Sequence, residues 1–159
     1  MMHKVKNIVD RVLEWVSVIL LGLMTVLVTY QVVVRFAGAP NPYTEAISKY
    51  MFVWMVLFAG AYVFGLRGHM NIGFIRSKMS AKTATVVEMI CEGAIAAFAA
   101  TVMVYGGYMQ SMKQMSQLDA ALQIPIGHIY MAVPISGLFI VFYSLCNEVE
   151  LFQRLKNHD

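Results

Sequence analysis

Long stretches without a formally charged residue divide this chain into four apolar blocks. The blocks cover residues 15–34, 50–66, 93–112 and 120–147. About twenty helical residues cross the ~30 Å hydrocarbon core of a bilayer, and the last block is long enough to hold a loop as well as a span. The pattern therefore predicts an all-α integral membrane protein with four transmembrane helices. The expected spans are, approximately, residues 13–35, 45–66, 87–109 and 127–148.

Amphipathic segments between these blocks predict short interfacial helices. Residues 1–14 carry apolar side chains on one helical side and are expected to lie on the membrane surface before the chain turns inward. Residues 69–85 predict a similar helix on the inner leaflet. The third span is expected to continue outside the membrane until the segment from Leu122 to Pro125 ends it. Pro134 predicts a kink in the last span.

Basic residues gather in alternate connecting segments. They lie in the two terminal tails and in the loop between the second and third spans: Lys4, Lys6, Arg11, Arg67, Arg76, Lys78, Lys82, Arg154 and Lys156. The positive-inside rule then places both termini and this middle loop in the cytoplasm. Because these connections account for the net charge of +3, the charge does not indicate a nucleic-acid partner.

The composition leaves no room for a soluble domain. Hydrophobic residues make up 59% of the 159 residues and charged residues 13%, which is outside the usual soluble range. Residues 1–159 are therefore expected to form a single membrane domain.

Titratable residues form no recognisable catalytic, cofactor or metal-binding pattern. His69 and His128 are expected on opposite sides of the membrane, and Cys91 and Cys146 lack CxxC spacing. We therefore predict no catalytic, cofactor or metal site, and no enzyme. A membrane redox enzyme is a weaker alternative, because it would need facing His pairs or paired Cys residues.

Glu92 is the acid that reaches furthest into an expected span. It lies one turn, ~6 Å, beyond Glu88 on the third helix. A lone charge in lipid costs several kcal/mol, so Glu92 is either an acid that is paired or snorkels to the interface, or a proton or ion site. The nearby cations Arg76, Lys78 and Lys82 favour a paired acid. A small homodimeric proton-coupled exporter is the alternative function, but it would need an embedded acid in the first helix, where Glu14 lies only at the edge.

Two further patterns predict contacts between helices or subunits. Glu45 and Lys49 have the favourable order for an i, i+4 ion pair, which either marks the membrane boundary or faces a partner. Small residues form faces on which another helix could approach closely. They are Ala61 and Gly65 in the second span, and Gly93, Ala97, Ala100 and Gly107 in the third.

Two blocks of sequence combine acidic, basic, aromatic and small residues at characteristic spacings. In residues 42–72, PYTEAISKYMFVWMVLFAGAYVFGLRGHMNI, these positions are Glu45, Lys49, Tyr50, Trp54, Gly60, Ala61, Arg67, Gly68 and His69. In residues 122–137, LQIPIGHIYMAVPISG, they are Pro125, Tyr130 and Pro134. Both blocks resemble the small membrane subunit (DctQ type) of tripartite ATP-independent periplasmic (TRAP) transporters. One departure is Ala46, where the family often has a second acid.

The resemblance implies a multi-pass subunit of a sodium-coupled transporter in the bacterial inner membrane, without cofactors. The implied partners are a large membrane subunit that carries the sodium and substrate sites, a periplasmic substrate-binding protein and membrane lipids. The substrate would be a carboxylate-bearing organic acid of the sialic acid or dicarboxylate class. The small subunit would brace its large partner and help to dock the binding protein, for which residues 110–124 are a candidate. The expected interface residues are Glu45, Lys49, Trp54, Ala61, Gly65, Arg67, His69, Gly93, Ala97, Ala100, Pro125 and Pro134.

Overall fold

The computed structural model of the chain describes residues 2–39, 41–66 and 81–156. Their helices are α1 (Met2–Phe36), α2 (Pro42–Gly65), α4 (Ala81–Phe98), the π-helix η1 (Ala99–Gly106), α5 (Gly107–Gln114), α6 (Gly127–Tyr130) and α7 (Ala132–Lys156). Four continuous helical segments among them are long and apolar enough to cross a membrane: Lys4–Phe36, Pro42–Gly65, Thr83–Gln114 and Gly127–Gln153. The predicted all-α membrane fold with four spans is confirmed.

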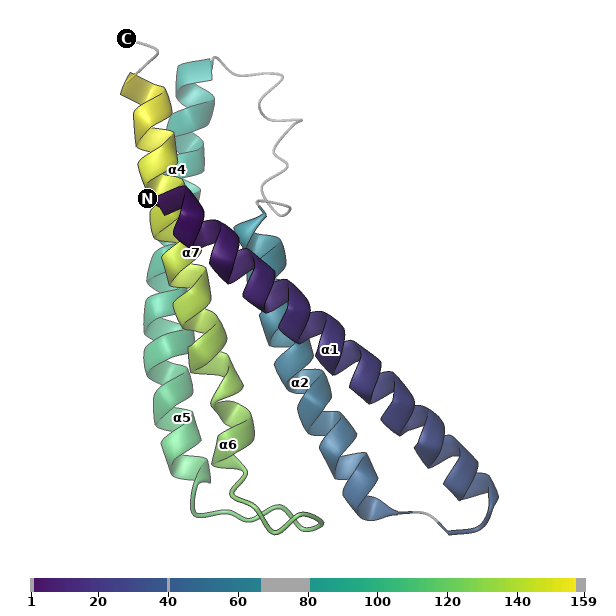
Figure 1. Cartoon of the computed structure of the whole chain (residues 1–159). Helices are drawn as coiled ribbons and strands as arrows, with labels where there is room; N and C mark the ends of the chain where they lie inside the picture. Colours follow the sequence, from purple (N-terminus) through teal and green to yellow (C-terminus); the bar gives the residue numbers. More distant parts are fainter. Residues whose placement is uncertain (1, 40, 67–80, 157–159) are drawn as a thin grey trace.

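The spans are arranged as a row rather than a closed bundle (Figure 1). α1 packs along α2, α2 packs on α7, and α7 packs on α4 and η1. α1 also crosses α7, but within the described residues the third span contacts neither α1 nor α2. The fourth span is therefore central: 39% of its most apolar window is buried, against 6% of that of the first span.

The two ends of this row differ. The first turn of α1 and the last turn of α7 lie at one end, here called the termini end (Figure 1). The α1–α2 connection and the loop 115–126 lie at the other, here called the loop end.

A small core joins α1, α2 and α7 near the termini end. Its buried members are Leu13, Ala61, Phe64 and Tyr143. A Cβ atom on Gly65 would lie 2.5 Å from Cζ of Tyr143, so only glycine permits this approach of α2 to α7. The Tyr143 hydroxyl donates a hydrogen bond to Asp10 of α1. Since lipid supplies no hydrophobic drive between helices, close packing and such hydrogen bonds hold the spans together.

Glycines of the fourth span allow an equally close approach of the third. A Cβ atom on Gly127 would lie 2.5 Å from the backbone carbonyl oxygen of Ser111, and one on Gly137 would lie 2.7 Å from Cβ of Met103. The third and fourth spans are therefore in contact from α6 into α7.

Two expected helix boundaries are wrong. α1 runs from Met2 without the expected turn between a surface segment and the span, because Lys6 and Asp10 are held by side chains of α7. α5 ends at Gln114, not near Leu122, because the backbone beyond it pairs within the loop instead.

The last span has the expected irregularity near Pro134. Met131 separates α6 from α7, and Pro134 has no N–H to donate to the carbonyl of Tyr130. The surface helix expected at 69–85 falls mostly outside the described residues.

Candidate partner interface at the loop end

The start of α2 is built by short-range polar contacts. Asn41 is the N-cap, and its side-chain oxygen accepts a hydrogen bond of 3.0 Å from the backbone N–H of Tyr43. Pro42 occupies the first helical position, where its missing N–H costs nothing. Glu45 lies in the first turn, where the helix dipole favours an acid. These residues fix where α2 begins and which way Glu45 lies.

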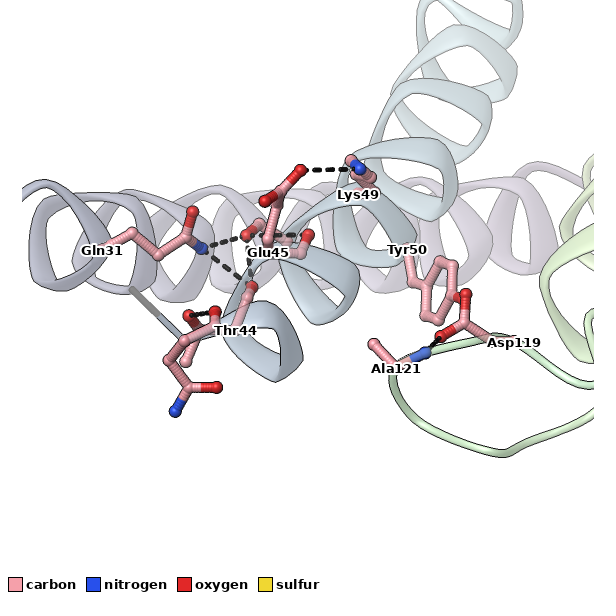
Figure 2. Close-up of polar contacts among 9 residues, drawn as sticks. Gln31, Thr44, Glu45, Lys49, Tyr50, Asp119 and Ala121 are labelled. Carbon is pink, nitrogen blue, oxygen red and sulfur yellow. Dashed lines mark hydrogen bonds and ion pairs between the residues drawn. The ribbon is translucent and has the colours of Figure 1, made fainter. Parts of the chain in front are cut away.

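Gln31 ties α1 to this first part of α2 (Figure 2). Its side-chain amide donates to the backbone carbonyl of Thr44 over 2.8 Å and also to the hydroxyl of Ser48. Ser48 is buried and donates in turn to the Thr44 carbonyl over 2.6 Å. Gln31 is not among the residues predicted from the sequence, although an amide three residues inside an apolar run is a signal for such a contact.

The predicted Glu45–Lys49 pair forms. Lys49 Nζ lies 2.8 Å from Glu45 Oε1, and the two side chains are 69% and 64% exposed. Such an exposed pair contributes little to stability, because water screens the two charges. Both side chains are available to a partner or to lipid.

Asp119 attaches the loop 115–126 to α2 (Figure 2). One carboxylate oxygen accepts backbone hydrogen bonds from Ala121 and Leu122, at 2.9 and 2.8 Å. The other accepts a hydrogen bond from the hydroxyl of Tyr50. These donors, above all Tyr50, hold the pKa of Asp119 below its usual range, with a smaller effect from the charge of Lys49.

The loop itself is a fixed hairpin. Asp119 N–H donates to the carbonyl of Ile124 and Ile126 N–H to the carbonyl of Gln117, both over 2.9 Å. Gln123 has a left-handed backbone (φ 55°), and its side chain donates back to the carbonyls of Asp119 and Ala120. The segment 110–124 thus has a defined surface that is attached to α2. The signal in the sequence is that Asp119 is the only acid between Glu92 and Glu148.

The other expected interface residues occupy different environments. Ala61 and Gly65 are buried within this chain, against α7. Trp54 is half-buried and packs edge-to-face on Phe58 of the same helix, with ring centroids 5.3 Å apart. Pro125 forms a β-bridge with Leu118, and Pro134 is buried. Arg67 and His69 lie outside the described residues. The role of all of these at an interface stays a prediction.

The expected small-residue face of the third span is divided by η1. Gly93, Ala97 and Ala100 are exposed, whereas Gly107 is buried against Val133 and Pro134. In an α-helix Gly107 would share the face of Ala100, seven residues earlier. In a π-helix the backbone hydrogen bonds join residues i and i+5, so each turn holds about one more residue than an α-helical turn. The residues that follow a π-helix are therefore rotated about the helix axis, away from the side that an α-helix would give them. Gly107 therefore does not share the exposed side of Ala97 and Ala100, but α7 of the same chain approaches it closely, as expected of a small residue.

Glu92 lies away from this interface, near the termini end. Its side chain is 1% exposed. One carboxylate oxygen accepts from the Ser144 hydroxyl and the other from the Asn147 amide, both over 2.9 Å. Lys6 of α1 donates to Asn147 over 3.4 Å. Glu92 is thus hydrogen-bonded to α7. The side chains of Arg76, Lys78 and Lys82, expected beside it, lie outside the described residues, so its pairing with a cation stays a prediction.

The described residues contain no group of three or more His, Cys, Asp or Glu side chains that could hold a metal ion. The arrangement at the loop end offers a hydrogen-bonded hairpin beside an exposed ion pair.

Comparisons with known proteins agree on one family. Residues 24–154 match the family described as "Tripartite ATP-independent periplasmic transporters, DctQ component". A protein of Haemophilus influenzae described as a candidate TRAP transporter small permease protein is 22% identical over 141 residues, which cover 88% of this chain and 87% of that protein. The sialic acid TRAP transporter small permease protein SiaQ of Vibrio cholerae is 23% identical, over 88% of this chain and 81% of its own length.

Proposed function

The chain belongs to the DctQ component family of TRAP transporters, and from that premise we propose that it braces a larger membrane subunit and helps to dock a periplasmic substrate-binding protein. The assembled transporter imports a carboxylate-bearing organic acid together with sodium across the bacterial inner membrane. The sialic acid or dicarboxylate class is the proposed substrate class, and the name of the Vibrio cholerae relative supports the former.

The family match over residues 24–154 carries this proposal, because it reaches into all four spans. It favours a transporter subunit over the small homodimeric exporter considered above.

The row of spans supports the bracing role. α1 and the third span lie at the two edges of the row, so both have long sides that no other described helix covers. On the third span, the exposed residues Gly93, Ala97 and Ala100 would let a helix of the large subunit approach closely.

The hairpin at the loop end supports the docking role. A partner that binds a preformed surface loses less conformational entropy than one that must order a loose loop. The hairpin 115–126, held to α2 by Tyr50 and Asp119, is such a surface. It lies beside the exposed Glu45–Lys49 pair (Figure 2).

Purification from the native membrane in mild detergent, followed by mass spectrometry, tests the bracing role. We expect a much larger multi-span protein in one-to-one ratio. Ala97→Leu and Ala100→Leu should each reduce its recovery several-fold, because the added side chain keeps the helix backbones apart. Ala120→Leu adds the same bulk to the exposed loop and is the matched control. Full recovery with both third-span variants would refute the proposed contact face.

Transport in proteoliposomes tests the rest of the proposal. The complete complex and its binding protein should take up sialic acid or a dicarboxylate only with an inward sodium gradient. Uptake that is unaffected by removal of the gradient would contradict sodium coupling.

A further inference from the structure

A groove between α1 and α2 at the loop end is lined in part by the exposed Glu45–Lys49 pair and in part by apolar residues. Two neighbouring cavities of 420 and 350 Å³ lie in it, and both are lined by Val28, Gln31 and Glu45. The first also reaches Arg35, and the second reaches Lys49. Another face of the same helix pair carries a cavity of 370 Å³ whose lining residues are all uncharged. Of these two faces of the α1–α2 pair, only the groove has charged lining residues, and Glu45 and Lys49 also line a cavity of 230 Å³ between α2 and the loop 115–126.

The groove changes from polar to apolar along its length. Arg35, Glu45 and Lys49 line it at the loop end, and Met24 and Phe52 line it further along. Met24 and Arg35 are eleven residues apart on the same side of α1, which is ~16 Å in a helix. That length is about half of the ~30 Å hydrocarbon core, or one leaflet. A lipid with its headgroup at Arg35 would have an acyl chain of matching length beside Val28 and Met24.

The charges at the polar end alternate in sign. Arg35 forms no ion pair among the described residues, and its guanidinium has the fork geometry that suits a phosphate. Glu45 is paired with Lys49 but remains 64% exposed, and a carboxylate has about four acceptor positions, so it can accept further hydrogen bonds. A zwitterionic ligand with a phosphate and a primary ammonium group matches this order of cation and acid.

We propose that this groove binds a phosphatidylethanolamine-type phospholipid. The phosphate lies at Arg35, the ammonium group donates to Glu45, and an acyl chain lies along Val28 and Met24. Phosphatidylcholine carries no N–H for Glu45, and phosphatidylglycerol carries a net negative charge beside it, so both bind more weakly. The site is built from the α1–α2 pair and its connection, so its lipid binding can be measured on the isolated chain.

Native mass spectrometry of the full chain tests the headgroup. The protein is purified in mild detergent and offered phosphatidylethanolamine, phosphatidylcholine and phosphatidylglycerol with identical acyl chains. We expect about five-fold more phosphatidylethanolamine to be retained than either of the other two lipids, which is the ratio that one additional hydrogen bond would give. Arg35→Gln should abolish its retention, and Glu45→Gln should remove only the preference for it. Lys113→Gln, which removes an exposed cation of α5, and Glu14→Gln, which removes an exposed acid of α1, are the controls for charge.

The acyl chain is tested by filling the groove. Val28→Trp should reduce retention of phosphatidylethanolamine to the level of Arg35→Gln, whereas Val26→Trp, on the uncharged face of the pair, should leave it unchanged. Both positions are exposed, so neither substitution disturbs the core. Undiminished retention in Arg35→Gln or Val28→Trp, or a preference for phosphatidylglycerol in the unmodified chain, would overturn the proposal.

Discussion

Glu92 gives the sharpest test of how the third and fourth spans are held together. Its buried carboxylate accepts hydrogen bonds of 2.9 Å from Ser144 and from Asn147. Hydrogen bonds between membrane helices contribute ~0.6 kcal/mol on average and at most ~1.7 kcal/mol each. Glu92→Ala should therefore reduce the free energy of unfolding by about 1–3 kcal/mol from these two bonds, and the space left by the side chain adds to that loss.

Reversible unfolding of the purified chain in mixed micelles, with increasing dodecyl sulfate, measures this loss. Glu88→Ala removes an equal charge one turn closer to the termini end and is the control. Glu92→Gln should fall between the two, because its amide can accept from Asn147 and donate to Ser144. If Glu92→Ala and Glu88→Ala agree within about 0.5 kcal/mol, the pairing of Glu92 does not hold α4 to α7.

Two other predictions concern the contacts near the loop end. Gly127→Ala places a Cβ atom 2.5 Å from the Ser111 carbonyl oxygen and should reduce the free energy of unfolding by ~1–3 kcal/mol in the same assay. Gly22→Ala is the control, because no atom lies within 4 Å of its added Cβ atom, and it should not reduce stability. Equal effects of the two substitutions would refute the close approach of the third and fourth spans. Because the pKa of Asp119 is lowered on folding, attachment of the loop is complete above the ordinary carboxyl pKa and is lost as the pH falls through the lower, folded value. Tyr50→Phe should raise that pKa towards its ordinary value in a carbon-13 NMR titration and speed amide exchange in residues 115–126; an unchanged titration midpoint would contradict the contact.

The spans could be predicted because hydropathy records burial in lipid directly. Long runs without charge indicate segments that cross the lipid, where every backbone N–H and C=O group needs a hydrogen bond within the chain. Helices meet this need locally, so the fold class could be predicted without knowing any contact between helices. The Glu45–Lys49 pair is equally local, since it depends only on the spacing of two residues in one helix.

Contacts between distant segments could not be predicted from such patterns. Tyr50 and Asp119 are separated by 69 residues, and although Asp119 is the only acid between Glu92 and Glu148, nothing in the sequence identifies Tyr50 as its partner. The partners of Glu92 depend on the register of α7 against α4, which the sequence does not state. The rotation of Gly107 depends on η1, whereas the small-residue pattern assumes an α-helical period throughout.

The position of the fourth span in the row has a consequence for biosynthesis. The third span contacts only α6 and α7 among the described elements, and those are made last. As the chain leaves the ribosome, the α1–α2 hairpin and the third span enter the membrane with no helix packing between them. The last helix must then insert between two parts that are already in the bilayer. A chain that stops before Gly127 would consequently lack this packing and keep only the Tyr50–Asp119 contact of the loop 115–126 between the two parts.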